Sequence, residues 1–213
     1  MGATYNQVAG QNAERLAALS DGVFAVAMTL LVLDLHGPAV EAIHSEQALW
    51  MALQRLAPRL LMFAMSFLTL GIFWVGQQTQ LNHLERSERS LTWIHLVFLF
   101  AVSLTPFSTS LLAEFVQYRV ALLAYWLNIV LLGGTLFFSW TCATRGGLVN
   151  RDLAPAHIRA IRRRIVIGQS LYAFGAALCL IDTYWSIAFI MAVQVFYAFG
   201  LEWPRRRRKS REL

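Results

Sequence analysis

The sequence predicts an all-α integral membrane protein, a bundle of six membrane-spanning helices. Composition supports this prediction, because 57% of the 213 residues are hydrophobic and only 14% are charged, whereas soluble domains average about 25% charged residues. In addition, six apolar stretches are close to the roughly 20 residues that a helix needs to cross a bilayer. They cover residues 16–35, 58–80, 91–113, 119–142, 164–182 and 184–203.

The first stretch carries three residues that are unusual in a membrane helix, Ser20, Asp21 and Gly22. They could form the N-cap of a helix that begins at Gly22. Such a helix would end at Leu35 after covering about 21 Å of a hydrocarbon core that is about 30 Å thick. A start at Leu16 gives a full span instead. Asp21 then lies inside the membrane, where a carboxylate needs a partner.

The later stretches differ in their prolines and in their connections. Pro58 falls at the expected start of the second helix, where proline is tolerated, whereas Pro106 lies inside the third helix and should bend it. The fifth and sixth stretches nearly touch at Asp182 and therefore predict a tight hairpin. The long connections at residues 36–57 and 150–164 mix apolar and polar residues, so each could be a surface helix or a loop.

Basic residues collect on one side of this topology. Fifteen of the eighteen Lys and Arg precede the first stretch, follow the second or the fourth, or end the chain, and only Arg55, Arg59 and Arg119 fall on the other side. Because Lys and Arg favour the cytoplasmic side, both termini should be cytoplasmic. The same pattern accounts for the net charge of +6, so we expect no nucleic-acid partner and expect the basic end of the chain to lie against anionic headgroups.

Nothing in the sequence indicates an enzyme, a metal site or a cofactor. Cys142 and Cys179 lie in separate stretches without metal-ligand spacing, and the histidines outside the stretches are scattered, with no partner at catalytic spacing. We therefore expect one six-span domain at residues 14–203. A cytoplasmic lead-in at 1–13 and a basic cytoplasmic tail at 204–213 should flank it.

The first helix has an apolar side and a polar side. Steps of three and four residues stay on one helix face, so Gly22, Val26, Thr29 or Leu30, and Leu33 form one stripe. Apolar stripes of this kind ordinarily face lipid or pack in the core. Asp21 points at a neighbouring angle, toward other helices.

The residues from Arg15 to Leu33 closely resemble the first-helix signature of the transmembrane protein 175 family, the endosomal and lysosomal potassium channels and their bacterial homologues. The likeness extends more loosely to Trp74, Trp93-Ile-His95 and Pro106-Phe107. It implies a homotetrameric, potassium-permeable cation channel whose first helices line a central pore. It further implies a bacterial inner membrane location, with the lipid bilayer, potassium ions and other copies of the chain as partners.

The resemblance also implies roles for individual residues. Val26, Leu30 and Leu33 match apolar layers that constrict the pore, and Thr29 matches a hydroxyl layer beside the first constriction. A hydrogen-bonded network that fastens the pore helix is expected to contain Arg15, Ser20, Asp21, Trp74, Trp93 and His95. Asp34, near the outer mouth, could raise the local cation concentration or be a helix-end charge among headgroups.

Several positions depart from the family pattern and leave alternatives open. Gln77 and Gln78 stand where relatives often carry histidine, and His95 stands where they often carry asparagine. His95 could make the network sensitive to pH or could be a purely structural hydrogen-bonding residue. The competing function is a secondary transporter that uses Asp21 as an intramembrane protonation or ion site.

Overall fold

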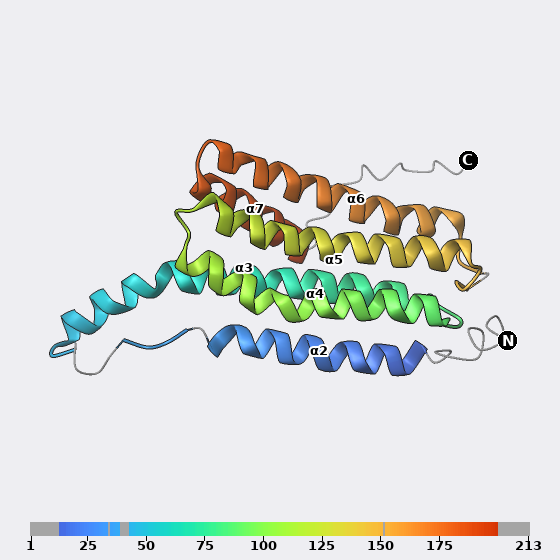
Figure 1. The fold of residues 1–213 in the computed structure, drawn as a ribbon, viewed down its shortest axis with the longest axis horizontal. Coiled ribbons are helices and arrows are strands. Elements are labelled where there is room, and N and C mark those ends of the chain that lie inside the picture. The colour runs from blue at the N-terminus through green and yellow to red at the C-terminus, as the bar shows by residue number, and fades with distance from the viewer. Residues whose placement is uncertain (1–12, 34, 39–42, 151, 200–213) are drawn as a thin grey trace, which may run out of the picture.

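The computed structural model describes residues 13–33, 35–38, 43–150 and 152–199, and these form an antiparallel bundle of helices (Figure 1). The predicted lead-in, apart from Ala13, and the predicted tail lie outside these residues, as does Asp34. The helices are α2 (Ala13–Leu33), α3 (Glu46–Leu81), α4 (Arg89–Glu114), α5 (Arg119–Arg145), α6 (Pro155–Ala177) and α7 (Thr183–Ala198), with a 3₁₀ turn, η2 (Leu178–Leu180), between the last two.

The pore-helix candidate α2 lies at one edge of the bundle, and α6 lies at the opposite edge (Figure 1). α2 packs on α3 and α4, while α6 packs on α5 and α7. Large side chains such as Phe24, Phe98, Tyr125 and Trp140 are almost completely buried between the helices. The other described helices thus contact α2 on one side only, and its other side is exposed.

Four helices, α2 to α5, are long and apolar enough to cross a membrane. The predicted spans at 16–35, 91–113 and 119–142 match α2, α4 and α5 to within three residues at each end. The spans predicted at 164–182 and 184–203 correspond to α6 and α7 over the described residues, and these helices are weaker candidates. α7 has 16 residues, or about 24 Å of helix, and the first turns of α6 carry arginines.

The position predicted for Pro58, at the start of the second helix, is wrong. Ser45 caps a helix that begins at Glu46, because its hydroxyl oxygen accepts a hydrogen bond from the Ala48 N–H over 3.1 Å. Pro58 therefore lies inside α3, where it removes one backbone donor and favours a bend. The N-terminal part of α3 leaves the bundle at an angle to the other helices (Figure 1).

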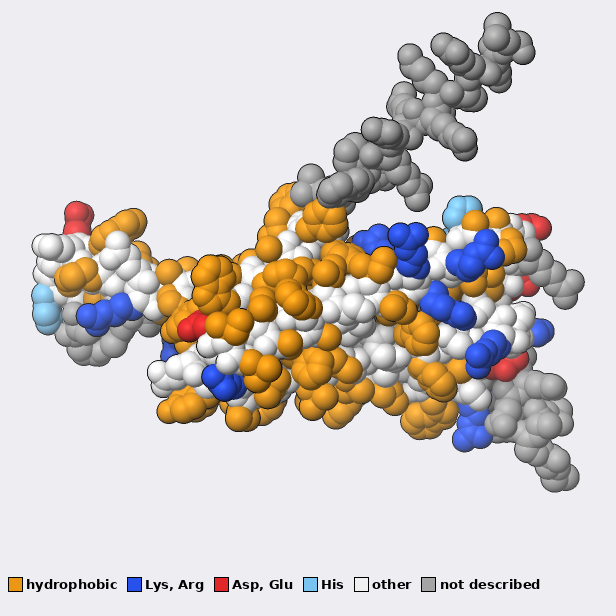
Figure 2. All heavy atoms as spheres, turned by 90° about the horizontal axis from the view of Figure 1, so that it is seen from above, with side chains coloured by type: hydrophobic (Ala, Val, Ile, Leu, Met, Phe, Trp, Pro, Cys, Tyr) orange, Lys and Arg blue, Asp and Glu red, His pale blue; other side chains and the backbone are white. Residues whose placement is uncertain are grey.

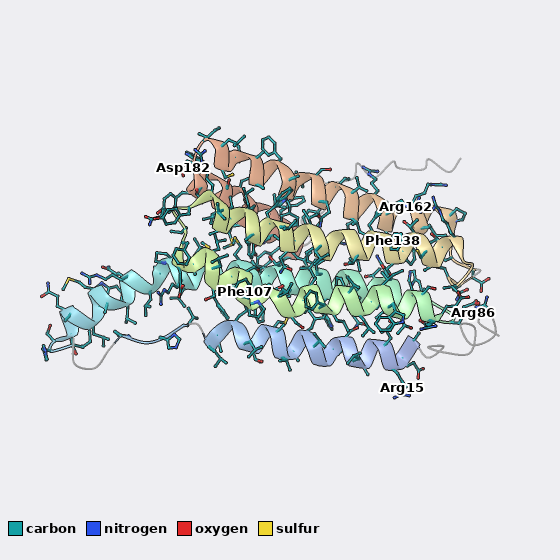
Figure 3. The ribbon with its side chains drawn as sticks, viewed as in Figure 1. Arg15, Arg86, Phe107, Phe138, Arg162 and Asp182 are labelled. Atoms are coloured by element: carbon teal, nitrogen blue, oxygen red, sulfur yellow. The ribbon has the colours of Figure 1, made fainter. Side chains whose placement is uncertain are left out.

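The connection predicted at residues 150–164 is mostly helical and continuous with the fifth span, since α6 begins at Pro155. The predicted hairpin near Asp182 is confirmed, because α6 and α7 pack together and Asp182 caps α7 by accepting a hydrogen bond from the Tyr184 N–H over 2.6 Å. One end of the bundle thus contains the starts of α2, α4 and α6, and the other contains the hairpin. Figure 3 places Arg15 and Arg86 at the first end and Asp182 at the second.

Candidate functional site

α2 presents two contrasting sides. One side is buried against α3 and α4 and consists of Leu16, Ser20, Phe24, Ala27 and Leu31. The opposite side is exposed in the part of the chain that the structure describes: Val26 is 58% exposed, Leu30 42% and Leu33 65%. Gly22 and Thr29 are exposed as well. The structure therefore brings the predicted constriction residues together on one free face.

Thr29 lies on this free face, between the levels of Val26 and Leu30. Its hydroxyl donates within the helix, toward the carbonyl oxygens of Ala25 at 3.0 Å and Val26 at 2.8 Å. Because the proton is directed to the backbone, the remaining lone pair of the hydroxyl oxygen is available to another group. In chemical terms, Thr29 adds a weak acceptor to an otherwise apolar surface.

Asp21 is fastened to α3. Its Oδ1 accepts a hydrogen bond from the indole N–H of Trp74 over 2.8 Å and another from the side-chain amide of Gln78 over 2.6 Å. Both donors lie near the end of α3, where one helical turn separates them. Hydrogen bonds to a carboxylate are stronger than those between neutral groups, so this pair fixes the rotation of α2 against α3.

A second, buried set of hydrogen bonds runs from α2 through α3 and α4 to α5. Ser20 donates to the Leu16 carbonyl over 2.8 Å and accepts from the Gln77 amide over 3.0 Å. Gln77 Nε2 lies 3.4 Å from His95 Nδ1, and His95 Nε2 lies 3.2 Å from the Ser139 hydroxyl. All four side chains are at most 3% exposed. We call Ser20, Gln77, His95 and Ser139 the buried relay.

The hydrogen bonds of the structure therefore match the predicted network only in part. They join Ser20, Asp21, Trp74 and His95, as expected, but through Gln77 and Gln78, which in the sequence stand out only as departures from the family pattern. Ser139 was missed too, since a lone serine in an apolar helix gives no signal of its partner. The motif Ser20-Asp21 itself predicted that donors must be nearby, and the two adjacent glutamines of α3 are those donors.

Trp93, another predicted member, lies outside these hydrogen bonds. Trp93 is 57% exposed, and none of the hydrogen bonds described for Asp21 or the buried relay reaches it. It precedes His95 by two residues, and two residues turn a helix by about 200°, so the two side chains leave α4 on opposite sides. Arg15 lies in the first turn of α2 and points away from the other helices in Figure 3, although it has an interaction within the chain.

Comparison with known proteins gives a consistent set of relatives. The sequence profile of a family described as the endosomal/lysosomal potassium channel TMEM175 matches residues 15–106. A potassium channel of Streptomyces collinus is 32% identical over 192 residues, which cover 87% of this chain and 91% of the relative. A potassium channel of Chamaesiphon minutus is 30% identical over 191 residues, which cover 86% and 92%.

A solved structure agrees with this assignment. The crystal structure of a lysosomal potassium-selective channel TMEM175 homolog from Chamaesiphon minutus superimposes with a TM-score of 0.78 at 27% identity. The match covers 88% of this chain and 97% of that one, so it includes the weaker helices α6 and α7 as well as α2. The integral membrane chain described above therefore belongs to the TMEM175 family.

Proposed function

We propose that this chain is one subunit of a homotetrameric, potassium-permeable cation channel in which four copies of α2 surround the conduction pathway. One observation carries the proposal: α2 is tethered by hydrogen bonds on one side, while its other side, with Val26, Thr29, Leu30 and Leu33, is exposed among the described residues. The relatives named as potassium channels support the choice of ion.

In this arrangement Val26, Leu30 and Leu33 form three rings along the pore. A step of four residues places the Leu30 ring about 6 Å above the Val26 ring, and the Leu33 ring lies about 4.5 Å further on. Narrow apolar rings lose their water and then block ions without any charged plug. The rings would have to widen and fill with water before ions pass.

Thr29 would supply the polar contact next to the first ring. Its hydroxyl proton is already directed to the helix backbone, so the oxygen is free to face a passing cation. Potassium gives up hydration water more easily than sodium. Four weak oxygen ligands therefore replace the lost water more completely for potassium than for sodium. No cofactor enters this mechanism, and potassium is the permeant ion.

The two tethers would set the direction of the rings. Asp21 with Trp74 and Gln78, and Ser20 with Gln77, hold adjacent residues of α2 on α3. Adjacent residues differ by about 100° around a helix, so holding both leaves little freedom of rotation. The face that contains Val26 is then directed away from the subunit interior.

We further propose that the protein lies in the bacterial inner membrane with both termini in the cytoplasm. Figure 2 shows arginine side chains gathered at one end of the visible face, the end where α6 begins, and apolar side chains along the middle. This end would face the cytoplasm by the preference of arginine for that side. The hairpin end would then lie outside.

Disulfide crosslinking tests the proposal directly. In a chain whose Cys142 and Cys179 are replaced by serine, the Val26→Cys variant should form covalent dimers under mild oxidation in membranes. Val166→Cys is the matched control, because Val166 is similarly exposed but lies on α6, at the opposite edge of the bundle. Equal crosslinking of both variants, or of neither, would overturn the placement of α2 at the axis.

A further inference from the structure

An apolar groove opens on the side of the bundle away from α2, level with the middle of α6. Its two sides are α3, with Ile72, Phe73 and Gly76, and α6, with Ile165 and Gly168. Both of these helices pack on α5 and α7, which contribute Leu136 and Tyr197 to the groove. The conduction mechanism proposed above leaves this surface unused.

The groove lies beside the last turn of α7, which is shorter than α6 in the described residues. α6 has 23 residues and α7 has 16, which correspond to about 34 Å and about 24 Å of helix. The two are joined by a tight hairpin, so α6 continues beyond the last turn of α7 toward the basic end of the bundle. Tyr197, in that last turn, lies against Gly168: a Cβ atom there would be 3.6 Å from the tyrosine hydroxyl oxygen.

A cation lies at the basic end of this groove. Arg164 lines it, one helical turn before Gly168, and its guanidinium carbon is 5.5 Å from the centre of the Tyr197 ring. Arg159, Arg162 and Arg163 precede it on α6, and α6 contains no Asp or Glu. Arg162 is directed to α5, where it lies 5.9 Å from the ring of Phe137, so Arg164 is the arginine of this series that lines the groove.

An apolar channel with a cation at its end matches a phospholipid in both chemistry and direction. An acyl chain would fill the space between Ile72, Leu136 and Ile165, and a phosphate would lie at the level of Arg164. Arginines near the ends of membrane helices reach toward the headgroup region, and each basic group there favours anionic lipids. We propose that this groove binds an anionic phospholipid of the leaflet that faces the basic end of the bundle.

Native mass spectrometry of the purified full-length protein tests the proposal, with phosphatidylglycerol and phosphatidylcholine of identical acyl chains as probes. The wild type should retain phosphatidylglycerol in preference to phosphatidylcholine. Arg164→Gln should lower this preference about fivefold. Arg163→Gln, a neighbouring exposed arginine that does not line the groove, should change it less than about twofold. Equal effects of the two substitutions would overturn the assignment.

A second variant tests the apolar part of the groove. Gly168→Leu directs a side chain into it, and the spacing to Tyr197 tolerates the added Cβ. This variant should elute as the wild type does on size exclusion but bind fewer molecules of both lipids. If it elutes normally and binds both lipids undiminished, the acyl chain does not lie in the groove and the proposal is wrong.

The basic residues at 204–213 are the competing lipid-binding element. A chain that ends at Phe199 should keep the preference for phosphatidylglycerol and its sensitivity to Arg164→Gln. Loss of the preference in the shortened chain would assign lipid binding to the tail instead and would overturn the proposal. None of these measurements depends on ion conduction, so they stand apart from the proposed channel function.

Discussion

The carboxylate of Asp21 accepts a hydrogen bond from the indole of Trp74 over 2.8 Å, across a sequence separation of 53 residues. This contact joins α2 to the C-terminal part of α3, and the same oxygen also accepts a hydrogen bond from the Gln78 side-chain amide. An aspartate used in this way is a structural anchor. The proposed role of Asp21 is accordingly to hold the pore helix and not to carry ions or protons.

Removing the anchor should therefore damage assembly before selectivity. Asp21→Ala leaves the Trp74 and Gln78 donors without their acceptor and should lower the free energy of unfolding by about 2 kcal/mol. Asp21→Asn keeps an oxygen at this position and should cost less. Denaturant unfolding and light scattering after size exclusion measure both effects. An Asp21→Ala tetramer of normal stability that has lost selectivity would show that this role is wrong.

The buried relay can be tested at its first member. Ser20→Ala removes the acceptor of the Gln77 amide in a fully buried position and should lower the free energy of unfolding by about 1 kcal/mol. Ser103→Ala is a suitable control, because the hydrogen bond described for the Ser103 hydroxyl stays within its own helix, to the Leu99 carbonyl. Thermal unfolding in detergent compares the two. Equal stability of both variants would show that the relay contributes nothing.

The proposed constriction predicts a gain of leak on polar substitution. Val26→Asn or Leu33→Asn should hydrate an apolar ring and raise potassium flux into liposomes on the order of tenfold. Val166→Asn, on α6, supplies the control for a polar group added to another exposed membrane surface. Unchanged flux in Val26→Asn and Leu33→Asn would count against these side chains facing the pore.

Thr29 should affect ion preference while leaving assembly unchanged. Thr29→Val preserves the shape of the side chain and removes the oxygen, so the permeability ratio of potassium to sodium should fall about threefold. Reversal potentials under bi-ionic conditions measure this ratio. A ratio equal to that of the wild type would place the source of any selectivity elsewhere along the pore.

The channel and the transporter hypotheses predict different currents. A pore predicts discrete single-channel steps when the purified protein is placed in a planar bilayer. A transporter that uses Asp21 predicts slow turnover strictly coupled to a proton gradient. Coupled transport without steps would exclude the channel mechanism.

The sequence predicted some parts of this structure better than others, and the reasons are physical. Hydropathy located α4 and α5 closely, because lipid requires a full apolar span. It did not include the first turns of α3 and α6 in the spans, because these turns mix apolar and polar residues and the connections that contain them are predicted only as surface helices or loops. A capping serine, Ser45, extends α3 past Pro58, and no hydropathy window detects that. Local pattern is a poor guide to helix ends in such segments.

The candidate site shows the same division. Helix periodicity predicted which face of α2 contains Val26, Leu30 and Leu33, since that depends on local geometry alone. It did not identify Gln77, Gln78 and Ser139 as partners, because those contacts depend on how α3, α4 and α5 pack. The two-residue spacing between Trp93 and His95 is the sequence signal that separates them, because it places their side chains on opposite sides of α4.

The distribution of hydrogen bonds along the buried relay has a mechanical consequence. α2 and α3 are joined at two successive residues of α2, whereas the link from Gln77 to His95, at 3.4 Å, is the longest in the series. If the pore widens, α2 and α3 should therefore move together as one rigid unit. The contact between α3 and α4 at His95 would then be the hinge. A bulky substitution there would change the open probability of the channel without changing a residue that lines the pore.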